Sequence, residues 1–182
     1  MPQPLPQPMD IIVTADRPGA SLGTLRWQGG AVPCALGRAG IRAEVDKREG
    51  DGATPAGTYP LRRVFCRTDR IAPPETGLPV RAIAPADGWC DDPDDGAYNR
   101  LVTLPINASH ERMWRDDHIY DLVVEIGHND SPPVPGRGSA IFLHLAREGF
   151  APTEGCVAVT PHAMMDLLSA CDATTRVVIE GP

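Results

Sequence analysis

The chain has 182 residues, a formal net charge of −7, and 20 prolines and 18 glycines that together make up about a fifth of it. This length suits one domain with a sizeable core, and the acidic balance excludes nucleic acid as an expected partner, because phosphate binding needs clustered Lys and Arg. No stretch approaches the roughly 20 apolar residues that a membrane-spanning helix needs, and the many turn formers argue against a helical bundle.

The first third of the chain is predicted to be a meander of short antiparallel strands. Residues 1–9 alternate Pro and Gln with little else, which suits an extended lead-in without regular structure. From Ile11 onward the runs IIVTA, SLGTLRWQG and GAVPCALGR are each β-prone and bounded by turn residues. Residues 43–59 are polar and rich in glycine, so we expect a surface loop that leads into the strand TYPLRRVFC.

The middle of the chain, residues 67–108, is predicted to be a long excursion of loops. It contains many prolines and the acidic run DDPDDG at residues 91–96. The spacing of an EF-hand and its closing glutamate are absent, so the acidic run indicates a solvated loop rather than a calcium site.

The last third of the chain contains the clearest secondary structure. The apolar runs YDLVVEIGH and AIFLHLA predict two strands separated by the turn-rich segment at residues 129–139. PHAMMDLLSACD, from Pro161, has apolar residues at helical spacing and a proline suited to a first turn. RVVIEG then predicts a strand that returns to the sheet. Residues 10–182 are therefore expected to form a single, mostly β domain with one or two short helices.

The five cysteines are scattered singly, which excludes a zinc ribbon and a disulfide scaffold. Cys34, Cys66 and Cys171 are expected to be packing residues. Cys90 lies beside Trp89 in a predicted loop, and the sequence leaves open whether its side chain is exposed or buried.

Cys156 is the cysteine in a setting suited to chemistry. The predicted strand AIFLHLA contains His144, and a loop with Gly155 places Cys156 twelve residues later in the sequence. A thiolate nucleophile needs a nearby base, which His144 supplies, and Gly155 lets a substrate carbonyl approach the neighbouring backbone amides as an oxyanion hole. From the residues alone an alternative stays open, in which Cys156 is a small buried apolar residue and His144 a satisfied core histidine.

The run Thr153-Glu154-Gly155-Cys156-Val157, preceded by His144, resembles the (Ser/Thr)-x-Gly-Cys signature of the L,D-transpeptidase catalytic domain family. DGATPAGTYPL resembles a segment of that family in which a Thr-Pro turn leads into a strand, so the resemblance spans roughly residues 43–159. It implies a mostly β fold, a β-sandwich or mixed sheet, that needs no cofactor and no metal. It also implies that Cys156 attacks a peptidoglycan stem peptide to form a thioester, with His144 as acid and base, Thr153 supporting the loop, and the Gly155 and Cys156 amides holding the oxyanion.

The sequence departs from the family pattern at two points. Ala158 stands where the family usually has Arg or Asn, and the spacing from His144 to Cys156 is shorter than in many members. Substrate positioning is therefore expected from His128, Arg137 or Arg147 in neighbouring loops. Two acceptors of the acyl group remain open. An amine would make the protein a transpeptidase, and water would make it a cell-wall peptide hydrolase or amidase.

A zinc site is the alternative from another class of chemistry. His110, Asp117 and His128, with Glu125 as a base, loosely resemble the zinc-dependent D-alanyl-D-alanine peptidases. The competing interpretation is that residues 109–118 are a charged loop and that His128 ends a strand.

The expected location follows from the substrate. The resemblance implies the periplasm or cell envelope. The first ten residues show no basic region followed by an apolar core, so no secretory signal is visible, and a cytoplasmic location is the other expectation.

Overall fold

The computed structural model describes residues 9–181, and the lead-in expected at residues 1–9 lies, apart from Met9, outside them. Its main feature is a sheet of nine strands in the order β11-β12-β13-β3-β2-β1-β14-β6-β7. Their bounds are β1 Asp10–Ala15, β2 Leu22–Trp27, β3 Gly30–Ala35, β6 Gly57–Cys66, β7 Val80–Ala82, β11 Leu122–Ile126, β12 Phe142–Leu145, β13 Val157–Val159 and β14 Arg176–Ile179. The mostly β prediction is therefore confirmed, as are the antiparallel β1-β2-β3 meander and the strands at β11, β12 and β14.

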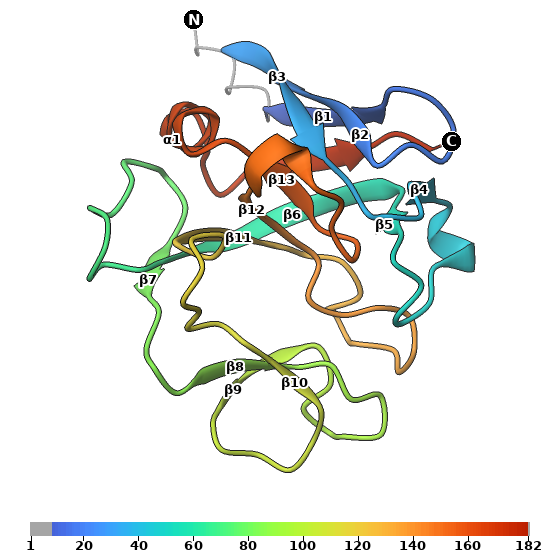
Figure 1. Cartoon of the computed structure of the whole chain (residues 1–182), viewed down its shortest axis with the longest axis vertical. Helices are drawn as coiled ribbons and strands as arrows, with labels where there is room; N and C mark the ends of the chain where they lie inside the picture. The colour runs from blue at the N-terminus through green and yellow to red at the C-terminus, as the bar shows by residue number, and fades with distance from the viewer. Residues whose placement is uncertain (1–8, 182) are drawn as a thin grey trace, which may run out of the picture.

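The long strand β6 closes this sheet on itself. Residues 57–60 pair with β14, whereas residues 61–66 pair with β11 at the other end of the strand order. The eight strands from β11 to β6 therefore form a continuous ring of hydrogen-bonded neighbours, and β7 extends it beside residues 64–66. Figure 1 shows β6 running through the middle of the molecule, between β11 and the strands near the two termini.

The central strands are buried on both faces. Every residue of β11 and β12 is buried, as expected for the continuous apolar runs of the sequence. On one face Leu143 and Val157 pack with Met164 and Leu168 of the helix α1 (Pro161–Ser169) in the main core. The helix predicted from Pro161 is confirmed, with Thr160 as its N-cap.

The opposite face carries a second core and a small sheet that the sequence did not predict. The order of this sheet is β10-β8-β9, with β8 at Asp87–Cys90, β9 at Arg100–Thr103 and β10 at His110–Arg112. Figure 1 shows it as a separate layer beyond β11 and β12. Trp89 packs edge-on against Phe65 and Phe142, with ring centroids 6.3 and 5.0 Å apart.

The prediction of loops throughout residues 67–108 is therefore wrong. Contacts with Phe65 and Phe142, which are distant in the sequence, give β8 its structure, and local propensity does not contain that information. Cys90 lies in the same strand and is fully buried. Cys34, Cys66 and Cys171 are also buried, as expected.

The segment at residues 43–59 is not a simple surface loop. It contains the 3-10 turn η1 (Glu44–Asp46) and the strand β5 (Thr54–Pro55), which pairs with β4 (Ile41–Arg42). The ammonium of Lys47 donates to the Asp51 carboxylate, and their side chains are only 3% and 8% exposed. Two of the charged residues of this segment therefore form an internal ion pair. The expectation of a surface loop is wrong at these positions. A second 3-10 turn, η2 (Glu148–Phe150), follows β12.

Within residues 9–181, no helix is both long and apolar enough to cross a bilayer.

We predict that Lys47→Met lowers the free energy of unfolding by about 1–3 kcal/mol, because the Asp51 carboxylate then keeps only its longer contact with a cation, to Arg42 at 3.4 Å. Arg26→Met, on an exposed position of β2, is the matched control and should change stability by less than about 0.5 kcal/mol. Urea unfolding monitored by circular dichroism measures both. Equal stability of the two variants would contradict the structural role of the pair.

Candidate active site

The pairing of β12 with β13 brings His144 and Cys156 to one place. The two strands are parallel, with Leu143 opposite Val157, so Cys156 comes to lie beside Phe142 at the start of β12. Residues two apart on a strand share a face, which puts Phe142 and His144 on the same side. The backbone N–H of Phe142 donates to Cys156 Sγ at 3.3 Å.

His144 and Cys156 line a common pocket, the cysteine pocket, of about 100 Å³. Its remaining lining residues are Glu111, Arg115, Ile119, Tyr120, Arg147, Thr153 and Glu154. Two of these carry a guanidinium group and two a carboxylate, so charged groups of both signs face the thiol and the imidazole.

The Cys156 thiol is protonated in the free protein. It is 8% exposed, and it donates to the Ala140 carbonyl at 3.2 Å. Burial, together with the nearby Glu111 carboxylate, raises the pKa of the thiol to about 12. Ala140 has a φ of 52°, an uncommon conformation for a residue with a side chain, in which its carbonyl contacts the sulfur.

His144 is a neutral base in this structure. Its Nδ1 lies 2.9 Å from the Leu145 carbonyl oxygen, and because a carbonyl can only accept, Nδ1 carries the proton and Nε2 has a free lone pair. Burial lowers the pKa of His144 to about 4, and Arg147 and Arg115 add to this effect. The resting pair is therefore a neutral thiol and a neutral imidazole.

The loop that ends in Cys156 is held by its own side chains. The Thr153 hydroxyl donates to the Cys156 carbonyl at 2.6 Å and accepts from the Gly155 N–H at 3.1 Å. Gly155 has a φ of 138°, and a Cβ there would lie 2.9 Å from the Ala53 carbonyl oxygen, so the position requires glycine. Because the Gly155 amide is already bonded, the Cys156 amide is the remaining one of the two expected to hold an oxyanion.

The three expected substrate-positioning residues lie in different places. Arg147 is exposed and lines the cysteine pocket. Arg137 donates to the Val45 carbonyl at 3.1 Å, and His128 is buried edge-on against Tyr59. Neither of these two is among the described residues that line the pocket.

His128 lies beyond the end of β11 that is far from His144. β11 runs antiparallel to β12, and His144 pairs with Val123, near the beginning of β11. At the other end of β11 the Ile126 N–H donates to the Ile141 carbonyl, and His128 follows two residues later. Cys156 also lies at this end of β12, beside Phe142, but the His128 ring packs against Tyr59 and does not line the cysteine pocket.

The residues of the zinc alternative are not gathered at one point. His110 Nδ1 is 2.8 Å from the Ala108 carbonyl oxygen, and the Asp117 carboxylate accepts two hydrogen bonds from Arg115. His128 is buried against Tyr59. Across residues 9–181, no three His, Cys, Asp or Glu side chains are placed to hold a metal ion.

Sequence reasoning missed Glu111, Arg115 and Tyr120 of the cysteine pocket, because it interpreted residues 109–118 as a charged loop and Tyr120 only as the start of a predicted strand. The Tyr120 ring packs edge-on against His144 at 5.3 Å, and its hydroxyl donates to Glu111 Oε1 at 2.7 Å. Arg115 lies over the Tyr120 ring at 5.1 Å. The only sequence signal was that Glu111, Arg115 and Tyr120 lie in a short segment, because the contact of Tyr120 with His144 joins residues that are distant in the sequence.

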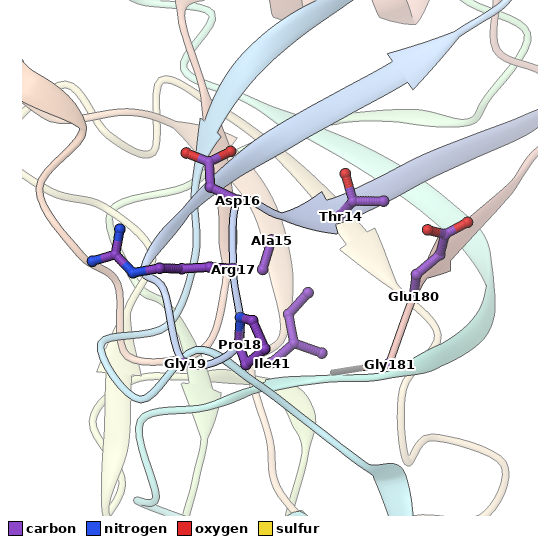
Figure 2. Close-up of a pocket in the computed structure, with 9 residues that line it drawn as sticks. All are labelled: Thr14, Ala15, Asp16, Arg17, Pro18, Gly19, Ile41, Glu180 and Gly181. Atoms are coloured by element: carbon purple, nitrogen blue, oxygen red, sulfur yellow. The ribbon is translucent and has the colours of Figure 1, made fainter.

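Another pocket, shown in Figure 2, lies at the turn after β1, beside the end of β14. It has a volume of about 270 Å³, and its ionisable lining residues are Asp16, Arg17 and Glu180. None of the described residues around it is a cysteine or histidine, so the cysteine pocket is the candidate active site.

A family model and several solved structures match this chain. Residues 11–179 match the YkuD family model, described as the L,D-transpeptidase catalytic domain. Two solved structures from Mycobacterium tuberculosis are similar: L,D-transpeptidase 3 in complex with a faropenem-derived adduct (16% identity, TM-score 0.42) and L,D-transpeptidase 1 (14% identity, TM-score 0.37). The matches cover 93% and 95% of this chain but only 60% and 63% of those chains. No curated protein matches the chain.

We predict that Cys156 in the free protein reacts slowly with iodoacetamide at pH 7, and that the rate rises about tenfold per pH unit without a plateau below pH 10, because the pKa of the buried thiol is about 12. Peptide mapping by mass spectrometry distinguishes Cys156 from the other four cysteines. A plateau between pH 6 and 8 would instead indicate a thiolate–imidazolium pair.

We predict that the protein loses stability as the pH falls from about 6.5 towards 4. Burial lowers the pKa of both His128 and His144 to about 4, so the unfolded chain binds protons that the folded chain does not. Each histidine contributes up to about 3 kcal/mol, present above pH 6.5 and lost through this window. Thermal unfolding from pH 4 to 8 measures the effect.

His128→Gln should reduce this acid dependence by about half, because one of the two buried titrating groups is removed. His162→Gln is the control, since the His162 side chain is 90% exposed. An identical pH profile for His128→Gln and the unmodified protein would disprove the assignment.

Proposed function

Because the chain belongs to the L,D-transpeptidase catalytic domain family, we propose that it is a cysteine acyltransferase that acts on peptidoglycan stem peptides. The observation that carries the proposal is the shared pocket of Cys156 and His144, in which the Leu145 carbonyl holds the imidazole with Nε2 free. Such a substrate places its action at the cell envelope.

The first step of the proposed reaction forms a thioester. His144 Nε2 takes the thiol proton as Cys156 Sγ attacks the donor carbonyl, and the Cys156 amide stabilises the oxyanion. Collapse of this intermediate breaks the C–N bond, and the leaving amine takes the proton from His144. Before attack, the thiol must leave its hydrogen bond to the Ala140 carbonyl, so a substrate in the pocket is required to start the reaction.

The second step transfers the acyl group. An acceptor amine gives a proton to His144 and attacks the thioester carbon, the C–S bond breaks, and Cys156 recovers its proton. Water in the same position would give hydrolysis. Arg147, whose exposed guanidinium lines the pocket, is suited to bind a carboxylate of the stem peptide.

Incubation with muropeptides followed by mass spectrometry tests the proposal. The unmodified protein should give new cross-links, together with an acyl adduct on Cys156. Cys156→Ala should abolish both, and His144→Gln should slow the reaction by about 10²- to 10⁴-fold, the usual contribution of a general acid–base group.

Cys171→Ala is the matched control, because Cys171 is buried beside the end of α1, in the main core rather than at the cysteine pocket. It should retain activity. Shortened stems in place of cross-links would assign the chain to hydrolysis, and full activity of Cys156→Ala would refute the cysteine mechanism.

A further inference from the structure

Glu111 is a carboxylate of the cysteine pocket that takes no part in the proposed reaction. It lies in the middle of β10, opposite Trp89 of β8 in an antiparallel pair. Opposite residues in such a pair carry their side chains on the same face of a sheet. The Trp89 ring packs against Phe142 of β12, with centroids 5.0 Å apart, so Glu111 faces the layer that contains β12 and the candidate active site.

The contact that Glu111 makes with this layer is a hydrogen bond. The Tyr120 hydroxyl donates to Glu111 Oε1 at 2.7 Å. The Arg115 guanidinium lies 3.9 Å from the same oxygen, beyond hydrogen-bond distance, and donates instead to Asp117 at 2.8 and 2.7 Å. Tyr120 is 3% exposed, and a buried tyrosine hydroxyl usually needs a partner of this kind. Glu111 therefore serves as the acceptor for Tyr120.

Tyr120 is in direct contact with the base of the candidate active site. Its ring packs edge-on against His144 and Phe142, with centroids 5.3 and 6.0 Å apart. The backbone before it is fixed to the end of β12, because the Leu145 N–H donates to the Ile119 carbonyl at 3.0 Å. With the backbone fixed, the hydroxyl is the end of the side chain that still needs an anchor, and its hydrogen bond supplies one.

The imidazole of His144 needs a contact that sets the direction of its ring. Its Nδ1–H donates to the carbonyl of the next residue, Leu145, at 2.9 Å. A single hydrogen bond lets a ring rotate about the N–H···O direction, whereas a general base must keep its lone pair directed at the proton that it takes. The Tyr120 ring, inclined at 66° to the imidazole, stands against this rotation. The orientation of Nε2 therefore depends on the position of Tyr120.

We propose that Glu111 is a positioning residue that acts through Tyr120 to keep His144 Nε2 directed at the Cys156 thiol. The proposal rests on the acyl transfer described above, in which His144 moves protons to and from Cys156. Glu111 acts here as a hydrogen-bond acceptor and not through its charge. Its charge opposes ionisation of the thiol, because Glu111 adds to the effect of burial that raises the pKa of Cys156. An uncharged acceptor should therefore replace it.

Three variants separate the hydrogen bond from charge and packing. Glu111→Gln keeps an acceptor oxygen for the Tyr120 hydroxyl but removes the charge. Glu111→Met has a similar length and lacks an oxygen, and Tyr120→Phe removes the hydroxyl with the ring in place. Glu75→Met is the matched control, because it makes the same replacement at an exposed position. Thermal unfolding confirms that each variant is folded.

Exchange of the His144 Nδ1–H proton with water, measured by NMR at pH 8, tests the proposal without substrate. The imidazole is neutral at this pH, because burial lowers the pKa of His144 to about 4. Glu111→Met and Tyr120→Phe should each speed this exchange by about tenfold or more, since the ring is no longer held. Glu111→Gln and Glu75→Met should change it by less than about twofold. The Leu145 N–H, which measures opening of β12 instead, should exchange at an unchanged rate.

Three results would overturn the proposal. The first is exchange that stays slow in both Glu111→Met and Tyr120→Phe. The second is an equal rise in Glu111→Gln and Glu111→Met, because the charge would then matter rather than the hydrogen bond. The third is a rise for the Leu145 N–H that matches the rise for His144 Nδ1–H, since the strand as a whole would then be opening.

The rate of acyl adduct formation on Cys156 from muropeptides is the functional measurement. Glu111→Met should lower the rate constant at saturating muropeptide by about 10- to 100-fold and leave the half-saturating concentration unchanged within about twofold, the pattern of a misplaced base. Glu111→Gln should keep the rate within about threefold of the unmodified protein. Adding Glu111→Met to His144→Gln should cause no further loss, because the residue through which it acts is absent. An equal loss in both backgrounds would contradict a role through His144.

The outcome is separable from that of the proposed function. The absence of an adduct on Cys156 in the unmodified protein would refute acyl transfer, and the proton exchange of His144 would still decide whether Glu111 holds the imidazole. An adduct that forms at the same rate in Glu111→Met and in the unmodified protein would refute the role of Glu111 alone.

Discussion

The parallel pairing of β12 with β13 is the constraint on which the candidate site depends. Parallel neighbours need a crossover, and here the connection between the two strands is short and carries the loop that ends in Cys156. The register of the pair sets the thiol beside Phe142 and two residues along the strand from His144. The closure of the large sheet through β6 fixes both strands between buried neighbours, so this placement is rigid.

Burial on both faces of these strands explains the electrostatic state of the site. A thiol and an imidazole that are out of contact with water both favour their neutral forms, which is why the pKa of Cys156 is raised while that of His144 is lowered. The protein therefore holds a neutral thiol in one pocket with a neutral imidazole of defined tautomer. In the function we propose, the thiol is activated only in the complex with substrate.

The small sheet is what turns a buried strand face into a cleft. It brings Glu111 of β10 to Tyr120, whose hydroxyl donates to this carboxylate and whose ring packs against His144. The cysteine pocket is lined by charged groups of both signs, the guanidinium groups of Arg115 and Arg147 and the carboxylates of Glu111 and Glu154.

Local pattern in the sequence determined much of this protein. Period-two and continuous apolar runs predicted β1, β2, β3, β11, β12 and β14, the helical spacing from Pro161 predicted α1, and the motif around Gly155 and Cys156 indicated the candidate nucleophile with His144. Tertiary structure alone decided the small sheet, the burial of Lys47 and Cys90, and the packing of His128 against Tyr59. These features depend on contacts between segments that are distant in the chain, which a local run of sequence does not encode. The charge, length and five cysteines of the chain excluded classes of function and the motif pointed to Cys156, whereas only the folded structure shows that this thiol shares a pocket with His144, because that placement depends on the register of β12 and β13.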